Sequence, residues 1–178
     1  MNILLIIIAI LVGAIALLLI IALFSRKEYS IEREITIDKT SNEVFQYLKH
    51  IKNQDKFSKW VMTDPDMKRE FRGEDGTVGF VYAWEGNKKA GKGEQEIKSI
   101  EEGKYLNLEI RFEKPFVAVA NTPFKIEALS PQQSKVTWGM SSKMNYPMNI
   151  MLLFMNIEKL LGKDLEISLR NLKGILEK

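Results

Sequence analysis

The longest hydrophobic segment of the chain is its N-terminal run, which spans Ile3 to Phe24 and has no charged or strongly polar side chain. As a helix with a rise of about 1.5 Å per residue, it would be roughly 33 Å long, enough to cross the hydrocarbon core of a bilayer. A cleavable signal peptide would need a basic segment before a shorter apolar core, and neither is present. We therefore predict a retained transmembrane anchor in residues 1–25 and a separate domain in residues 26–178.

Two basic residues, Arg26 and Lys27, follow the hydrophobic run directly. Because the cytoplasmic flanks of membrane helices are enriched in Lys and Arg, this placement favours a single-pass protein of the cell membrane with a cytoplasmic domain. Only residues 25–29 separate the run from the first predicted strand, so the tether reaches on the order of 15–20 Å at full stretch. The domain is therefore expected to rest on the membrane surface.

Between residues 29 and 144 the chain alternates apolar and polar positions with a period of two, the pattern of half-buried β-strands. The predicted strands cover residues 29–37, 67–72, 77–85, 91–100, 105–112, 117–129 and 135–144. In the third of them, the residues expected on the inner face are Val78, Phe80, Tyr82 and Trp84. Successive strands joined by short turns predict an antiparallel meander whose apolar face another element must cover.

Short helices are predicted between the first two strands. Thr40 is followed three residues later by Glu43, a spacing typical of a capping box at a helix start. A second short helix is expected to hold Phe57 and Trp60. The turn at residues 64–66 then ends this region, because Asp-Pro-Asp is a strong turn signal.

The C-terminal stretch, residues 146–178, is predicted to form one long helix. Pro147 lies in its first turn, where the missing N–H group of proline costs nothing. Apolar residues recur about every seven positions, but the interior Gly162 makes a coiled coil a poor alternative. The predicted fold class is α+β: a curved antiparallel sheet wrapped on this helix, preceded by one transmembrane helix.

Composition excludes several kinds of site. The chain has 178 residues, no cysteine and one histidine, so disulfides, thiolate nucleophiles and multi-histidine zinc sites are ruled out. The net charge is only +3 and charges of both signs are interspersed, so there is no nucleic-acid-binding footprint. The G-x-S-x-G, H-E-x-x-H and P-loop motifs are also missing. We therefore expect no metal, no cofactor and no nucleic-acid partner.

Three segments resemble the polyketide cyclase/dehydrase branch of the START-like (SRPBCC) superfamily. They are the capped helix TSNEVF at residues 40–45, the stretch FSKW at residues 57–60, and the closing helix around residues 162–173. The resemblance covers residues 29–178 and implies the helix-grip fold, with a deep cavity between sheet and helix that takes a hydrophobic ligand. It does not fix the activity, because the fold serves binding, transport and catalysis alike.

The candidate ligand-binding residues are those that such a cavity would expose. They are Trp84, Gln95, Phe112, Trp138 and Met140 on inward strand faces, and Met148, Met151 and Met155 in the apolar first half of the C-terminal helix. Methionine suits a wall that must fit variable apolar partners, and it equally suits a core seam. Gln95 and Asn121 could fix a ligand carbonyl or hydroxyl, or could satisfy backbone groups at a bulge.

Catalysis would need a carboxylate or imidazole with a tuned pKa inside the cavity. Glu158 is the candidate, because in a continuous helix it falls in one column with Met151 and Leu165. The alternative for Glu158 is an edge position in which its carboxylate reaches water or pairs with a lysine. His50 is expected near the end of a short helix, where histidine commonly interacts with the helix dipole, so we assign it no role.

One function is favoured and two alternatives stay open. The favoured one is membrane-anchored binding, transport or presentation of a lipid or other hydrophobic small molecule. The alternatives are a cyclase- or dehydratase-like enzyme with a hydrophobic substrate, and a protein-interaction module with a vestigial cavity. Ile150, Leu153, Ile157 and the loop of residues 115–117 are expected to form an exposed patch that contacts the bilayer at the cavity mouth; a dimer interface would explain the same residues.

Overall fold

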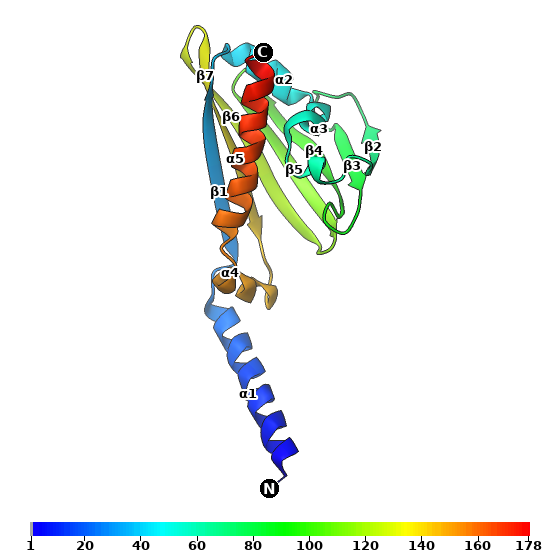
Figure 1. The fold of residues 1–178 in the computed structure, drawn as a ribbon, viewed down its shortest axis with the longest axis vertical. Coiled ribbons are helices and arrows are strands. Elements are labelled where there is room, and N and C mark those ends of the chain that lie inside the picture. The colour runs from blue at the N-terminus through cyan, green and yellow to red at the C-terminus, as the bar shows by residue number, and fades with distance from the viewer. Residues whose placement is uncertain (1) are drawn as a thin grey trace.

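The N-terminal hydrophobic run forms one helix, α1 (Ile3–Phe24), which projects away from all other elements of the computed structural model (Figure 1). The structure describes residues 2–178. Within these residues, α1 is the one helix long and apolar enough to cross a membrane. Its side chains are exposed all round except for Ala22, so the chain itself provides no cover for its apolar surface.

Seven strands form one antiparallel sheet in the order β1-β7-β6-β5-β4-β3-β2. The strands are β1 (Glu28–Ile37), β2 (Lys68–Arg72), β3 (Val81–Glu85), β4 (Lys92–Glu101), β5 (Tyr105–Lys114), β6 (Ala118–Ser130) and β7 (Gln133–Lys143). The strands from β2 to β7 form the predicted meander, and β1 joins it by pairing with β7, Ile31 opposite Met140. The predicted alternation is confirmed at the centre of the sheet, where Leu106, Leu108 and Phe124 are fully buried.

The helical segments lie before and after the meander. They are α2 (Ser41–Lys49), η1 (Ile51–Asn53), α3 (Gln54–Phe57), η2 (Val61–Thr63), η3 (Met148–Ile150), α4 (Met151–Phe154) and α5 (Ile157–Leu176). The capping box is confirmed: the Glu43 N–H donates to Thr40 Oγ1 at 3.2 Å, and the Thr40 N–H donates to Glu43 Oε2 at 3.1 Å. α2 then buries one apolar face, because its apolar residues recur at helical spacing.

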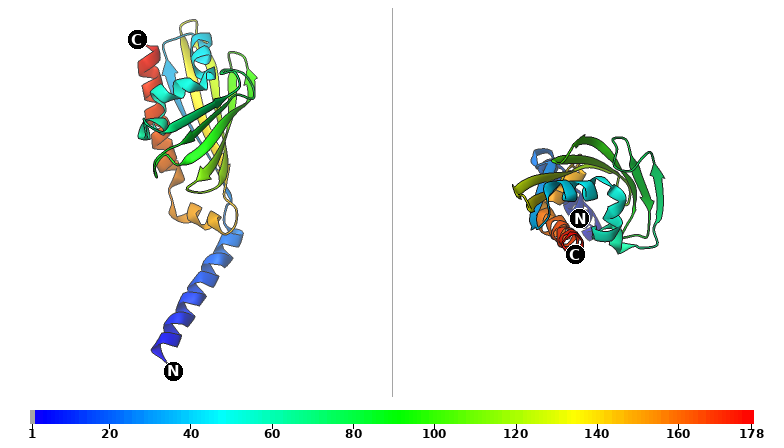
Figure 2. Two further views of the ribbon diagram at one scale, coloured as in Figure 1. Left: turned by 90° about the vertical axis from the view of Figure 1, so that its right-hand side faces the viewer. Right: turned by 90° about the horizontal axis from the view of Figure 1, so that it is seen from above.

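The sheet curves around α5 and the short helices, so that its inner face and α5 share one core (Figure 2). α5 contributes Leu165, Leu169 and Leu172, all of them buried. At about 25 cal/mol per Å² of apolar surface, each such leucine stabilises the fold by about 2 kcal/mol relative to exposure. The α+β helix-grip architecture is therefore confirmed.

Gly162 fits α5 against the edge strand β1. A Cβ atom at this position would overlap Nη2 of Arg33, so the missing side chain leaves room for the guanidinium. Arg33 Nε is 2.9 Å from Glu166 Oε1, and its Nη2 is 3.5 Å from Glu158 Oε1. Gly162 and Arg33 both interrupt apolar patterns in the sequence, and the structure shows why: the two residues contact each other.

The prediction of one continuous C-terminal helix is wrong. The chain forms η3 and α4, then leaves helical geometry at Met155 (φ −97°, ψ 123°), and α5 begins after Asn156. The Asn156 side chain accepts a hydrogen bond from the Lys159 N–H at 2.9 Å, which caps the new helix. Asparagine favours this capping role over a place inside a helix, so the helix restarts here.

The predicted third strand begins too early. Val78, expected on the inner face, is exposed, because Gly76 and Gly79 take positive φ angles of 89° and 88° and form a turn. Only glycine adopts this left-handed geometry readily, so the chain reverses here before β3 starts at Val81.

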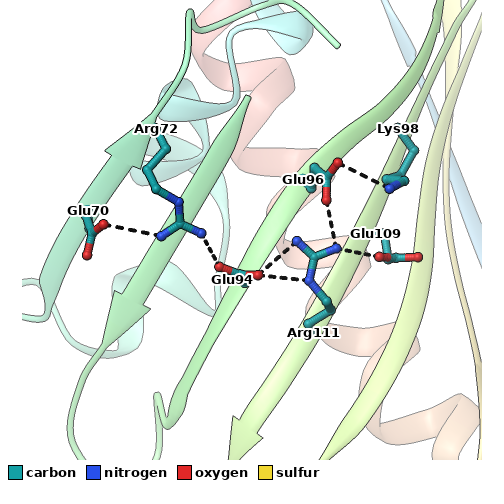
Figure 3. A network of polar contacts seen from close by, with 7 residues as sticks. All are labelled: Glu70, Arg72, Glu94, Glu96, Lys98, Glu109 and Arg111. Carbon is teal, nitrogen blue, oxygen red and sulfur yellow. Dashed lines mark hydrogen bonds and ion pairs between the residues drawn. The ribbon is translucent and has the colours of Figure 1, made fainter. Parts of the chain in front are cut away.

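The outer, water-facing side of the sheet carries a network of ion pairs that connects strands β2, β4 and β5 (Figure 3). Arg111 Nη2 is 2.9 Å from Glu94 Oε1 and Arg111 Nη1 is 2.8 Å from Glu96 Oε2. Hydrogen bonds from Arg72 first, and then from Arg111, hold the pKa of Glu94 below its ordinary value. The hydrogen bond from Arg111 also lowers the pKa of Glu96.

Replacing Arg111 with methionine is expected to destabilise the protein by about 1 kcal/mol at pH 7, since neighbouring carboxylates lose their shared cation. A carboxyl group whose pKa is lowered in the folded state stabilises the fold at pH values above its unfolded-state pKa, which is 4.5 for Glu94 and Glu96. This contribution is lost as the pH falls through the folded-state pKa. The difference between wild type and Arg111→Met should therefore shrink below pH 4.5. Urea unfolding at pH 7 and pH 3.5 measures it, with the exposed Arg170→Met as a control expected to be neutral. An equal difference at both pH values would contradict the prediction.

Candidate functional site

A cavity of about 260 Å³ lies between the inner face of the sheet and the segment formed by α3 and η2. Its apolar lining consists of Tyr29, Trp60, Val61, Met67, Tyr82, Trp84, Ala90, Ile110, Phe112, Pro115, Trp138, Met140 and Leu161. Its polar lining consists of Gln54, Ser58, Thr63, Lys89, Gln95, Lys114 and Thr122. A mostly aromatic wall with a few polar groups is typical of small-molecule sites, and apolar cavities of about 150 Å³ already take up benzene.

The wall opposite the sheet is held in place by α5. The backbone N–H of Lys59 donates to Ser168 Oγ at 2.8 Å, and this hydroxyl in turn donates to the Asp164 carbonyl at 2.7 Å. The Asn171 amide donates to the Phe57 carbonyl at 3.1 Å. These bonds fix the short, irregular segment between α3 and η2, which has too few residues to be stable as a helix of its own.

Aromatic contacts shape the sheet side of the cavity. The Trp138 ring lies 4.5 Å from Phe124, 5.6 Å from Trp60 and 5.9 Å from Phe57, measured between ring centroids. The Trp84 indole N–H donates to the Ala90 carbonyl at 3.1 Å. A Cβ atom on Gly93 would lie 2.9 Å from the Trp84 ring, so glycine makes room for this tryptophan on the inner face.

Two glutamine side chains meet inside the cavity. Gln95 of β4 points inward and its Nε2 donates to Gln54 Oε1 of α3 at 3.2 Å. Both residues are buried, with relative exposures of 4% and 5%. Gln54 Nε2 has no hydrogen-bond partner within the described chain. The pair therefore leaves the buried amide nitrogen of Gln54 unsatisfied beside a mainly apolar space.

Tyr82 closes the cavity toward α3. Its hydroxyl donates to Asp55 Oδ1 at 2.7 Å and accepts from Arg69 Nε at 3.2 Å, and Arg69 also pairs with Asp55 at 3.1 Å. Burial, followed by the hydrogen bond to Asp55, raises the pKa of Tyr82 far above its ordinary value. The Tyr82 hydroxyl is thus neutral, and its proton is already donated to Asp55, which suits a structural role rather than proton donation to a ligand.

The cavity opens near two chain connections. Lys89 and Ala90 belong to the connection between β3 and β4, and Lys114 and Pro115 lie where β5 leads into β6. In Figure 1 both connections lie at the end of the sheet that faces α4 and α1. Both lysines are exposed, so their ammonium groups stand in water at the rim while the interior is uncharged.

Several of the residues singled out from the sequence meet here. Trp84, Gln95, Phe112, Trp138 and Met140 all line the cavity. Asn121 is exposed on the outer face, because inward and outward positions alternate along β6 and its neighbour Thr122 points inward. The expectation that Asn121 faces the cavity is therefore wrong.

The methionines of the C-terminal segment lie elsewhere. Met148 is exposed and Met151 is half-buried, and neither lines the cavity. Met155 packs against the core and borders a second, more open hollow of about 480 Å³ near the start of β1. The helix break at Met155 is the reason, since it turns η3 and α4 away from the sheet (Figure 1).

Glu158 also lies outside the cavity. Its side chain is 75% exposed and pairs with Arg33, which is the edge position named as its alternative. Because α5 begins only at Ile157, the column that would align Glu158 with Met151 does not exist. None of the residues that line the cavity is an aspartate, glutamate or histidine, and within residues 2–178 no cluster of such residues could hold a metal ion.

The lining residues that were missed in the sequence include Gln54, Ser58, Tyr29 and Thr122. Thr122 shares the inward face of β6 with Phe124, so the alternation contained its signal. Gln54 and Ser58 lie in a four-residue helix and its cap, which is too short to show a periodic pattern. Their segment is held by hydrogen bonds between α5 and the neighbouring residues Phe57 and Lys59.

The sequence matches no protein-family model and no curated protein. Solved structures share its fold at low identity. Major latex-like protein 151 from Panax ginseng has a TM-score of 0.62 at 14% identity, covering 84% of this chain and 98% of its own. A norcoclaurine synthase point mutant from Thalictrum flavum, in complex with a transition-state analogue, has a TM-score of 0.63 at 8% identity, covering 84% and 94%.

A third similar structure is the Aha1 dimer from Colwellia psychrerythraea, with a TM-score of 0.58 at 16% identity, covering 84% of this chain and 96% of its own. At these identities the likeness concerns the fold. It agrees with the resemblance that the capped helix and the closing helix indicate. The chain thus shares the helix-grip fold with the latex-like protein and norcoclaurine synthase.

Proposed function

We propose that this protein is anchored in a membrane by α1 and binds a lipid or other hydrophobic small molecule in the cavity between sheet and helices. The observation that carries the proposal is the cavity itself, about 260 Å³ of space with a mainly aromatic and aliphatic lining. A protein core normally closes such space, because empty volume loses dispersion contacts on every side. A ligand of matching polarity would restore those contacts.

The junction between α1 and the body supports placement at the membrane. The buried Asn149 side chain donates to the Ala22 carbonyl at 2.6 Å and to the Ser25 carbonyl at 3.3 Å, which caps the end of α1. Arg26 Nη2 donates to the Leu152 carbonyl at 3.2 Å. These bonds replace a free tether by a fixed connection, so a membrane-inserted α1 would hold the body against the surface.

An exposed apolar collar surrounds this junction and supports the same placement. It consists of Phe24, Met148, Leu153 and Phe154, with Phe154 74% exposed. Ile157, expected in such a patch, is instead buried against the core, and Ile150 is half-buried. Aromatic and aliphatic residues at the level of a helix end suit the headgroup boundary of a bilayer. Arg26 and Lys27 favour a cytoplasmic body.

The cavity mouth is proposed to face the membrane. Phe116 and Val117, in the connection between β5 and β6, are exposed beside the lining residue Pro115. This connection lies at the same end of the body as the collar (Figure 2). A ligand could then pass between bilayer and cavity without crossing water. The enzyme and interaction-module alternatives have no comparable support, since Glu158 lies outside and the cavity is not filled by side chains.

A tryptophan in place of Ile110 is expected to abolish ligand binding, because Ile110 lines the cavity from β5 and the larger ring would occupy it. The measurement is native mass spectrometry of the full-length protein released from detergent micelles after incubation with mixed membrane lipids. The wild type should carry a one-to-one adduct that organic solvent extracts, and Ile110→Trp should not.

The matched control is Val119→Trp, which adds the same ring on the exposed outer face of β6. It should keep the adduct. A bare wild-type mass would refute hydrophobic binding. An adduct that Ile110→Trp leaves intact would place the lipid elsewhere, with the surface of α1 as the first candidate.

A further inference from the structure

The two glutamines inside the cavity have more hydrogen-bond donors than the chain satisfies. One N–H of Gln95 is used by the bond to Gln54 Oε1, and Gln54 Nε2 donates to nothing in the described residues. Exchanging the oxygen and nitrogen positions of both amides preserves this count, because a bond within the pair always uses one donor and one acceptor. Burying an amide N–H group without a partner costs free energy, so a hydrogen-bond acceptor next to Gln54 Nε2 would be stabilising.

A second unsatisfied donor belongs to the same lining. Nε1 of Trp138, on β7, is buried and has no hydrogen-bond partner among the described residues. Residues that line the cavity thus hold unpaired, buried donors on both its α3 side and its sheet side. Its lining includes no carboxylate, and its only cationic side chains, Lys89 and Lys114, stand exposed at the rim.

We propose that the ligand is a neutral, apolar molecule that places a carbonyl-type acceptor against Gln54 Nε2. A neutral acceptor fits because the interior has no charge to balance an anion, and burying an unpaired anion is far more costly than burying a carbonyl. Ketones, esters and quinones have this chemistry, whereas a plain hydrocarbon leaves the donors unpaired. This inference rests on the proposed function and specifies the ligand class of the same site.

The test compares two probes with one skeleton, benzophenone and diphenylmethane, which differ by a single carbonyl oxygen. Each is titrated calorimetrically into full-length protein in detergent micelles, with protein-free micelles as the blank. The wild type should bind benzophenone about tenfold more tightly than diphenylmethane, which is the effect of one buried hydrogen bond. Gln54→Met, which keeps the side-chain length, should lose this preference and bind the two probes with equal affinity.

The control Gln46→Met makes the same substitution on α2, where the side chain contacts Glu102 outside the cavity, and should keep the tenfold preference. Thermal unfolding of Gln54→Met at the wild-type temperature shows that this variant is folded. Equal wild-type affinity for the two probes, or a ketone preference that survives Gln54→Met, overturns the inference and leaves the proposed function standing. If the wild type binds neither probe, the inference and the proposed function are both overturned.

Discussion

Alanine in place of Trp138 is expected to lower the free energy of unfolding by about 3–5 kcal/mol, the usual loss when a large buried aromatic residue is truncated. Trp138 is 2% exposed and contacts aromatic rings from three segments: Phe57, Trp60 and Phe124. It therefore connects the sheet to the α3–η2 wall. Its removal would enlarge the cavity in addition to weakening the core.

The measurement is thermal unfolding of the full-length protein in a mild detergent, followed by circular dichroism. For a body of this size the loss corresponds to a fall in Tm of roughly 10 °C. Trp84→Ala is the matched control, since Trp84 is half-buried and contacts a single ring, that of Phe112. A loss in Trp84→Ala as large as in Trp138→Ala would contradict the assignment of Trp138 as the central contact.

Two arginines in the middle of α1, Val12→Arg together with Ile15→Arg, are expected to abolish stable membrane insertion. Both positions are exposed on a helix whose surface the chain leaves uncovered. An arginine at the centre of a membrane helix costs about 2.5–3.5 kcal/mol on insertion scales, so the pair costs about 5–7 kcal/mol. Alkaline carbonate extraction of membranes should leave the wild type in the pellet and release the variant.

The control for this experiment is Gly13→Ala, because no atom lies within 4 Å of the position of its added Cβ and alanine is a good helix former. It should remain in the pellet. If the double-arginine variant also resisted extraction, the collar around Phe154 and Leu153, rather than α1, would be holding the protein on the membrane.

The sheet and its inner face were predictable because their information is local. Inward and outward positions alternate along each strand, so Leu106, Leu108, Trp138 and Met140 could be assigned to one side without knowing their neighbours. The capping box at Thr40 was equally local. Five of the lining residues followed from this alternation alone, since any cavity in this fold must border the inner face.

Contacts between distant segments decided the rest. A continuous helix over residues 146–178 agreed with most local preferences, yet the chain breaks at Asn156, and η3 and α4 pack at the end of α1 through Asn149. That break moved Met155 and Glu158 away from the cavity.

The position of the Gln54–Gln95 pair in the cavity is likewise decided by contacts between distant segments. Gln54 lies in a four-residue helix with no periodicity, and it faces Gln95 only because α5 holds the α3–η2 segment across the sheet. Local patterning thus determined the strands, the apolar α1 and the inward aromatic residues, because each depends on neighbours a few positions away. Only the tertiary structure decided where the final helix begins and which polar groups enter the cavity, because both depend on packing between segments about 100 residues apart.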